Sequence, residues 1–415
     1  MKRIILIMAA VAAAISCSRT APSFEDAVLF RNTETDTIPY RIPTLSVLSD
    51  GRLLALADYR HCKLDIGFGR VDILGRISEG SGWGEPFVLI EGTGVPHAVD
   101  CGFGDAAMVA DRESGEVLVI TVCGETVYGH ATTNRQNPNR VALLRSLDNC
   151  RTWEPWKEIT EDVYGLFDAS AYGPVQSCFV TSGKIFQSRC VKVGSHYRIY
   201  AALCARPNGN RVIYSDDFGR TWKALGGCDA LAAAAGDEAK CEELEDGSVV
   251  ISSRITGGRI FNVFTYSDVE KGEGEWASQT FSGERNRGCT AVANACNGEI
   301  LFVPARRKDG EKVTLAFQSV PLGPERRAVG IYFKEIDGIM DPASLAADWD
   351  GPFRVTDKPS AYSTMTMLDN GSIAFYYEES DDPWPRGYDM VFRQIGIEEI
   401  TSGGYGPVKR SIWNR

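Results

Sequence analysis

An arginine in a strand-like setting is the first residue of this chain whose type and position could bind a substrate. Arg41 stands in the run Tyr40-Arg41-Ile42-Pro43, where Pro43 fixes its own φ and should hold Ile42 in an extended conformation. A guanidinium held in this way can bind a carboxylate through two parallel hydrogen bonds. A single arginine near a strand is usually a surface residue, so a carboxylate site requires other residues that converge on it.

Other residues with suitable chemistry stand at the ends of expected β-hairpins. In a hairpin, the start of the first strand and the end of the second lie side by side, opposite the turn. The hairpin ends that carry charged or phenolic side chains are Arg41 with Arg60, Asp105, Glu238 with Arg254, and Tyr362 with Glu378. If these ends meet at one rim, the arginines, the acids and the tyrosine share one face.

Repeated turns predict the element that would bring these ends together. Six runs of small polar residues followed by Gly have strand-like segments on both sides: 49–51, 113–115, 181–183, 245–247, 296–298 and 369–371. Such runs are hairpin signals, strongest for Asp-Gly and Asn-Gly. Six hairpins at this spacing predict an all-β fold of six four-stranded units, a six-bladed β-propeller. Unrelated hairpins in a β-sandwich are the alternative.

A second repeat supports the propeller. Ser146–Trp153 and Ser215–Trp222 share the pattern Ser-x-Asp-x-(Gly/Cys)-x-Thr-Trp, with degenerate relatives at 76–83 and 266–276. This pattern is the Asp-box, in which Asp closes a tight turn and Trp buries a large surface. In the first copy, Cys150 stands where the second copy has Gly. We therefore expect the turn of the first copy to be strained or differently shaped. We assign these repeats a structural role and no chemistry.

Together these motifs resemble bacterial exo-sialidases, or neuraminidases, of the Asp-box glycoside hydrolase superfamily, of the Bacteroides type. The resemblance extends from about Phe24 to Thr401 and rests on the Arg41 motif, the Asp-boxes, Asp237-Glu238 with Arg254, and Ala361-Tyr362-Ser363. It implies a catalytic propeller over 24–401 that hydrolyses terminal α-linked sialic acids from glycoproteins, glycolipids and oligosaccharides. Sialylated glycans are then the expected partners.

The resemblance also implies catalytic roles. Tyr362 resembles the nucleophile of these enzymes, Glu238 its base, and Asp65 the acid/base, with Asp58 and Asp72 as alternatives to Asp65. Sialic acid carries a carboxylate on its anomeric carbon, which would repel a carboxylate nucleophile, and sialidases use a tyrosine instead. A phenol needs a base, and nearby arginines should favour the phenolate. Asp65 must carry a proton to donate it to the leaving oxygen.

Substrate-binding roles follow from the same resemblance. Arg41, Arg254 and Arg326 resemble a three-arginine clamp on the sialic acid carboxylate, with Arg327 as the alternative to Arg326. Arg60 resembles an arginine near the 4-position of the sugar, and Asp105 a substrate-contacting acid. Two other functions remain open, a non-catalytic sialoglycan-binding propeller and a trans-sialidase. A binding protein would not need Tyr362 and Glu238 together.

Composition narrows the function classes. The 415 residues are 44% hydrophobic and carry a net charge of -11, which predicts a globular protein and argues against nucleic acid as a partner. Twelve cysteines and four histidines show no metal-ligand spacing or disulfide framework, so we expect neither a metal nor a cofactor.

The chain begins with a targeting signal. Residues 1–16 have the charged start, apolar run and small residues of a signal peptide, and Ala14-Ile15-Ser16-Cys17 resembles a lipobox. We expect Cys17 to be the first mature residue and to carry a lipid anchor, the protein's only membrane contact. The protein would then be a periplasmic or outer-membrane lipoprotein and a monomer, with plain secretion as the alternative. The tail 402–415 has no clear pattern and should be loosely packed.

Overall fold

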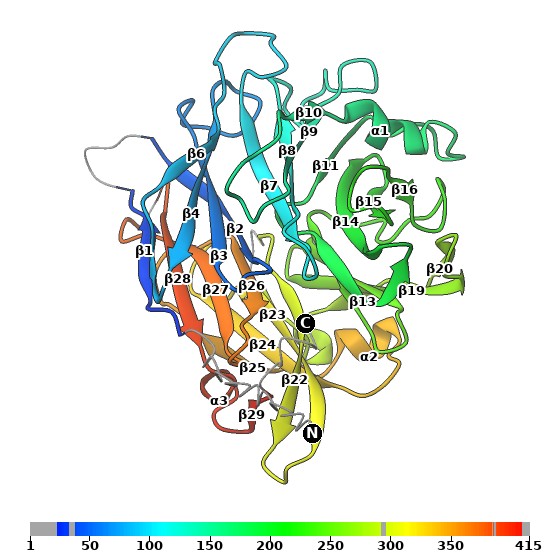
Figure 1. Ribbon diagram of the computed structural model, residues 1–415. Helices are drawn as coiled ribbons and strands as arrows, with labels where there is room; N and C mark the ends of the chain where they lie inside the picture. Colours follow the sequence, from blue (N-terminus) through cyan, green and yellow to red (C-terminus); the bar gives the residue numbers. More distant parts are fainter. Residues whose placement is uncertain (1–22, 33–37, 292–295, 384, 386, 409–415) are drawn as a thin grey trace, which may run out of the picture.

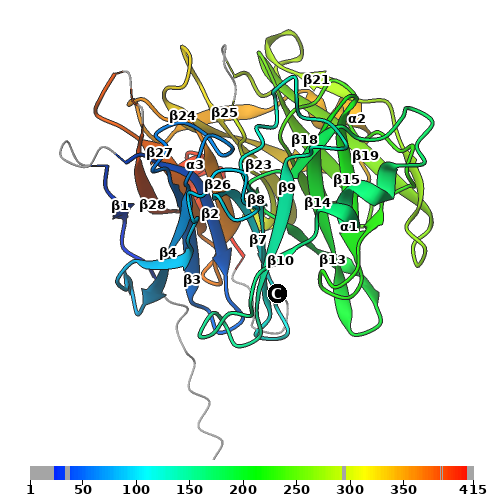
Figure 2. The ribbon, with the colours of Figure 1, turned by 90° about the horizontal axis from the view of Figure 1, so that it is seen from above.

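Six β-sheets follow one another around a central axis and form a six-bladed propeller (Figure 1). The computed structural model describes residues 23–32, 38–291, 296–383, 385 and 387–408. The expected signal peptide and Cys17 lie outside these residues. Figure 2 shows the strands running between two loop-covered ends of the molecule. The predicted fold class is therefore confirmed.

The first three sheets come from the N-terminal half of the chain. The first sheet contains β2 (Tyr40–Val47), β3 (Leu53–Tyr59), β4 (Asp72–Glu79), β5 (Gly82–Trp83) and β6 (Phe87–Ile90). The second contains β7 (Phe103–Ala110), β8 (Val117–Cys123), β9 (Arg140–Ser146) and β10 (Lys157–Glu158), with β12 (Gly183–Lys184) added parallel to β7. The third contains β11 (Ser177–Val180), β13 (Phe186–Val193), β14 (His196–Arg206), β15 (Gly209–Ser215) and β16 (Lys223–Ala224).

The other three sheets complete the ring. The fourth contains β17 (Ala239–Glu243), β18 (Val249–Ile255), β19 (Gly258–Asp268), β20 (Glu273–Trp276) and β21 (Thr280–Ser282). The fifth contains β22 (Ile300–Arg307), β23 (Lys312–Pro321), β24 (Val329–Ile336), β25 (Asp350–Arg354) and β29 (Tyr405–Pro407). The sixth contains β26 (Ser363–Met367), β27 (Ile373–Glu379), β28 (Asp389–Ile395) and β1 (Ala27–Phe30).

The ring is closed by strands from the two ends of the propeller sequence. β1 pairs antiparallel with β28, so the sixth sheet takes its outer strand from the N-terminal side. Leu29 and Phe30 are buried in one apolar cluster with Tyr376 and Phe392 of that sheet. Because β1 connects the N-terminal side of the propeller to its last sheet, this pairing holds the two ends of the ring together as well as completing one blade.

Helices are few and short. The structure contains α1 (Thr160–Tyr164), α2 (Pro342–Ala346) and α3 (Ile397–Ile400), with 3-10 turns at Gly165–Phe167 and Glu284–Asn286. Among the residues described, no helix is long and apolar enough to cross a membrane. In the tail, β29 pairs antiparallel with β22, so the expectation of loose packing is wrong for residues 405–407.

Four of the six predicted hairpin turns are confirmed, and two are wrong. Residues 49–51, 113–115, 245–247 and 369–371 each connect two paired strands. Residues 181–183 lie between β11 and β13. These two strands do not pair with each other, because both pair with β14. Residues 296–298 precede β22, whose hairpin to β23 turns at 308–311. The two segments instead contact each other, since Asn297 Nδ2 donates to the Ser182 carbonyl at 3.0 Å.

The two Asp-boxes form nearly identical turns. In the turn at 215–222, Asp217 accepts hydrogen bonds from the Thr221 amide and hydroxyl at 2.8 and 2.7 Å. Asp148 accepts the same two bonds from Thr152, also at 2.8 and 2.7 Å. Cys150 adopts φ 65° where Gly219 adopts φ 79°. The turn of the cysteine copy is therefore strained rather than differently shaped.

Candidate active site

One cavity contains every residue that the sequence predicted for the site. It measures about 310 Å³ and lies where the starts of the inner strands meet. The predicted residues among its lining are Arg41, Arg60, Asp65, Asp105, Glu238, Arg254, Arg326 and Tyr362. They come from five of the six sheets or from the loops next to them, so the ring brings together residues up to 321 positions apart in the sequence (362 minus 41).

A tyrosine, a glutamate and an arginine form the centre of this cavity. The Tyr362 hydroxyl donates to Glu238 Oε2 at 2.8 Å. Arg254 Nη1 donates to the same carboxylate oxygen at 2.6 Å and to the Tyr362 hydroxyl at 3.1 Å. Glu238 directly precedes β17 and Tyr362 directly precedes β26, so rigid inner strands hold both side chains. A phenol in direct contact with a carboxylate base has the geometry of an activated nucleophile.

The tyrosine is protonated at rest. Burial, followed by the Glu238 carboxylate, raises the pKa of Tyr362 well above its usual value near 10, while Arg254 and Arg326 lower it. The expectation that the arginines favour the phenolate is correct in direction, but desolvation outweighs their effect. A phenolate at Tyr362 would therefore require a base to take the proton, and Glu238 is in direct contact with the hydroxyl.

A buried glutamate that received no role from the sequence organises the site. Glu378 is the next-to-last residue of β27 and is fully buried; its carboxylate accepts from Arg41 Nε at 2.8 Å. The same carboxylate accepts from the Ile42 amide at 2.8 Å and from the Tyr362 amide at 2.9 Å. Glu378 thus positions an arginine of the first sheet and the tyrosine of the sixth at the point where the ring closes.

The same contact explains a wrong expectation. Ile42 adopts φ 61° and is not extended as Pro43 predicted. A β-branched residue in this region is strained, and β2 shifts its register against β3 between Arg41 and Thr44. The hydrogen bond from the Ile42 amide to Glu378 overrides the local preference. The resulting bulge directs Arg41 into the cavity.

Arginines surround the tyrosine on two further sides. The guanidinium carbons of Arg41 and Arg326 each lie 5.6 Å from the Tyr362 ring centroid. Arg326 Nε is buried and has no hydrogen-bond partner among the described residues. Arg327 instead donates to the Asp357 carbonyl at 3.3 Å and does not line this cavity. The geometry therefore favours Arg326 as the third cation of the site.

A second charged group lies across the cavity around Arg60. Its Nη2 lies 3.0 Å from Asp58 Oδ2 and 3.7 Å from Asp105 Oδ1, and its Nη1 lies 2.9 Å from Asp65 Oδ1. Burial raises the pKa of Asp58 to about 6, against the lowering effect of Arg60. Burial and the charges of Asp65 and Asp58 raise the pKa of Asp105 well above its usual range. One guanidinium thus holds three carboxyl groups together.

These contacts separate the three candidates for the acid. Asp58 is buried beneath Arg60 and also accepts a hydrogen bond from the Asp105 amide at 3.0 Å, so it positions these two residues. Asp72 accepts from His61 at 2.8 Å and from Arg70 at 3.1 Å, so it closes the base of the loop that carries Asp65. Asp65 alone has a largely exposed carboxyl group that lines the cavity.

Several residues of the cavity wall were missed by the sequence reasoning. The wall also contains Ile66, Val122, Thr126, Val127, Tyr128 and Phe179. Tyr128 and Phe179 pack edge to face with centroids 4.9 Å apart. No short motif marks these residues, because they come from loops and from two different sheets. Glu378 had a detectable signal, its place opposite Tyr362 at the end of the sixth hairpin.

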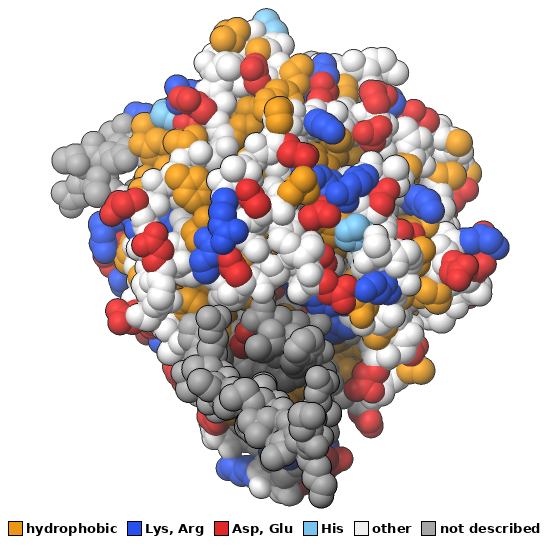
Figure 3. All heavy atoms as spheres, viewed as in Figure 1, with side chains coloured by type: hydrophobic (Ala, Val, Ile, Leu, Met, Phe, Trp, Pro, Cys, Tyr) orange, Lys and Arg blue, Asp and Glu red, His pale blue; other side chains and the backbone are white. Residues whose placement is uncertain are grey.

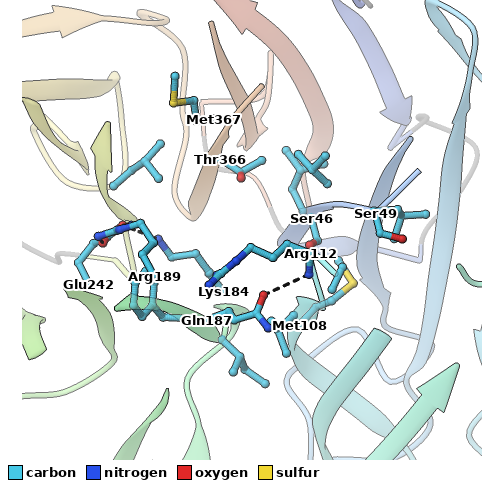
Figure 4. A pocket seen from close by; sticks show the side chains of 18 of the residues that line it. Ser46, Ser49, Met108, Arg112, Lys184, Gln187, Arg189, Glu242, Thr366 and Met367 are labelled. Atoms are coloured by element: carbon cyan, nitrogen blue, oxygen red, sulfur yellow. Dashed lines mark hydrogen bonds and ion pairs between the residues drawn. The ribbon is translucent and has the colours of Figure 1, made fainter. Parts of the chain in front are cut away.

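Another cavity, at the turn end of the inner strands, is a weaker candidate. It measures about 160 Å³, and Figure 4 shows Arg112, Lys184 and Arg189 in it beside Glu242. Its cations are bound by the protein itself: Arg189 by Glu242 at 2.7 Å and Lys184 by the Ile300 carbonyl at 2.9 Å. On the face shown in Figure 3, acidic and basic side chains are likewise interspersed. Arg41 and Arg254 near Tyr362 are also paired, but Arg326 Nε there is buried without a hydrogen-bond partner among the described residues, so the cavity at Tyr362 is the stronger candidate for an anion site.

Known sialidases resemble this chain. A sialidase of Micromonospora viridifaciens is 33% identical over 225 residues, covering 52% of this chain and 32% of the relative. A sialidase of Paraclostridium sordellii is 24% identical over 361 residues, covering 82% and 81%. Among solved structures, a Hadza microbial sialidase aligns with a TM-score of 0.66 at 21% identity, covering 87% of this chain and 66% of that one.

These similarities concern the sequence over part of the chain and the fold. No protein-family model matches the chain, and the chain spans less than half the length of several of the curated relatives that it matches. The solved structure establishes the likeness of the fold alone. The protein is a six-bladed β-propeller whose sequence is similar to those of known sialidases and whose fold is similar to that of a solved one.

Glu378→Gln tests the anchor. An amide cannot accept from Arg41 and two backbone amides without placing N–H against N–H, so we expect the free energy of unfolding to fall by about 3 kcal/mol or more. Urea denaturation measures this loss. Glu379→Gln is the matched control, since Glu379 binds half-exposed Lys358 at 2.9 Å and should cost less than about 1 kcal/mol. Equal, small losses in both variants would contradict the anchoring role.

Proposed function

We propose that the protein is an exo-α-sialidase that hydrolyses terminal α-linked sialic acids from glycoproteins, glycolipids and oligosaccharides. The observation that carries the proposal is the 2.8 Å hydrogen bond from Tyr362 to Glu238 within a cavity that contains Arg41, Arg254 and Arg326. The arginines suit a substrate with a carboxylate next to the reacting carbon. The sialidase relatives support the same reaction class.

Binding places the sugar between the two charged groups of the cavity. The carboxylate of sialic acid binds Arg41, Arg254 and Arg326, and this fixes the anomeric carbon beside the Tyr362 oxygen. The pyranose ring then extends toward Arg60 and Asp105 on the opposite side. Asp65, at the open edge of the cavity, reaches the oxygen that joins sialic acid to the rest of the glycan.

In the first step the glycosidic bond breaks. Glu238 takes the phenolic proton while the Tyr362 oxygen attacks the anomeric carbon, and Asp65 gives its proton to the leaving oxygen. The products are a sialyl-tyrosine, a protonated Glu238, an ionised Asp65 and the released alcohol. An uncharged phenol approaches the substrate carboxylate without the repulsion that a carboxylate nucleophile would meet.

In the second step water hydrolyses the sialyl-tyrosine. Asp65 removes a proton from water, whose oxygen attacks the anomeric carbon, and Tyr362 leaves with the proton that Glu238 returns. Two inversions give overall retention of configuration. A non-catalytic binding protein would have no use for a phenol hydrogen-bonded to a buried base, whereas transfer to another acceptor would differ only in this second step.

Covalent trapping tests the nucleophile. A fluorinated sialosyl fluoride should slow the second step and leave one sugar on Tyr362, located by intact mass and peptide mapping. Tyr362→Phe removes the proposed nucleophilic oxygen, so it should lose most activity and carry no adduct at residue 362. A label that lands reproducibly on Glu238 or Asp65, or an inverted first product, would exclude the tyrosine mechanism.

Substrates with different leaving groups test Asp65. Aryl sialosides with good leaving groups need little protonation, whereas sugar alcohols need a full proton transfer. Asp65→Asn should therefore reduce kcat/KM far more for natural sialosides than for an activated aryl sialoside. Equal losses on both substrates would show that Asp65 has a purely structural role.

Paired arginine variants test the clamp. A charge-assisted hydrogen bond contributes about 1.5–3 kcal/mol, so Arg326→Ala should lower kcat/KM at least about tenfold. Arg327→Ala is the matched control and should change kcat/KM by less than about twofold, because Arg327 binds the Asp357 carbonyl outside the cavity. The reverse order of the two effects would move the third clamp position to Arg327.

A further inference from the structure

Two large apolar side chains flank the proposed acid and face solvent. Leu64 is 60% exposed and Phe68 is 52% exposed, and Asp65 lies between them on the loop that joins β3 to β4. A single exposed leucine or phenylalanine needs no explanation. Two of them beside a proposed catalytic acid, at the edge of the substrate cavity, suggest contact with a ligand.

Contacts with Arg60 fix Leu64 in its exposed position. Arg60 Nη1 donates to the Leu64 carbonyl at 3.1 Å, and the same nitrogen lies 2.9 Å from Asp65 Oδ1. The backbone of Leu64 and the carboxyl group of Asp65 are therefore held by one buried guanidinium. The apolar side chain starts next to the acid because the protein places it there, not because a loop end is loose.

The rest of the loop is held equally firmly. The Phe68 amide donates to the Asp65 carbonyl at 3.3 Å, which forms a turn with Leu64 and Phe68 on its two sides. Between them, Ile66 turns inward and packs in an apolar cluster with Val122 and Phe179. Gly67 lies so close to the neighbouring loop that a Cβ would come within 2.9 Å of the Val127 backbone. The loop thus buries the side chain of Ile66 and leaves the side chains of Leu64 and Phe68 exposed to solvent.

We propose that Leu64 and Phe68 form an apolar aglycone-binding lip, which contacts the group attached to sialic acid through the scissile oxygen. The inference rests on the proposed function, because that oxygen must lie at Asp65 for the proton to reach it. The leaving group then passes over the residues on either side of Asp65. The sugar site is lined by charges, so the lip selects for aglycones with an apolar face and does not affect recognition of sialic acid itself.

Alkyl sialosides measure this contact separately from the chemistry. Methanol and octanol are leaving groups of similar acidity, so the ratio of kcat/KM for octyl over methyl α-sialoside reports on aglycone binding. Partial burial of two apolar side chains should raise this ratio to about ten in the wild-type protein. In Leu64→Ser/Phe68→Ser the ratio should fall to about two or below.

Leu147→Ser is the matched control, because Leu147 is 52% exposed in the Asp-box turn and does not line the substrate cavity. It should keep the wild-type ratio. A wild-type ratio near one, or a double variant with the wild-type ratio, would overturn the lip while leaving the sialidase proposal intact. A wild-type protein that hydrolyses neither sialoside would overturn the proposed function, and the lip with it.

Discussion

The Glu378 carboxylate is the contact on which the site and the closure of the ring both depend. It lies in the last sheet, and it accepts hydrogen bonds from Arg41 and Ile42 of the first sheet and from the Tyr362 amide. A buried carboxylate is stable only when such donors compensate for lost hydration. One group therefore joins the first and last sheets, fixes an arginine of the proposed clamp and sets the position of the proposed nucleophile.

That contact also accounts for local strain. The positive φ of Ile42 costs on the order of 1–3 kcal/mol, and the surrounding hydrogen bonds maintain it. Asp105, across the cavity, likewise adopts φ 54° at a register shift in β7, and its amide is held by buried Asp58. Two bulges on neighbouring inner strands thus direct the side chains of Arg41 and Asp105 toward the axis, and each bulge is fixed by a buried carboxylate of the adjoining sheet.

Most arginines of the cavity are paired with carboxylates of the protein. Arg41, Arg60 and Arg254 each bind a carboxylate, so the protein keeps them ordered in the absence of substrate. Arg326 Nε is buried and has no hydrogen-bond partner within the part of the chain that the structure describes. The same environment keeps Tyr362 protonated, because desolvation outweighs the nearby cations. In the mechanism that we propose, these preorganised donors bind the anion, and the phenolate forms only when Glu238 accepts the proton.

The sequence by itself determined the fold class, because hairpin turns and Asp-boxes are local signals. Its resemblance to sialidases also singled out eight residues, and these all line one cavity. It misassigned the segments at 181–183 and 296–298, since small polar residues before Gly look the same whether they close a turn or bind each other across the axis. It also predicted an extended Ile42. Only the tertiary structure decided the anchoring roles of Glu378 and Asp58, the place of Arg326 over Arg327, and the outward placement of Leu64 and Phe68. Each of these depends on a partner far away in the sequence or on burial, and neither is encoded in a local pattern.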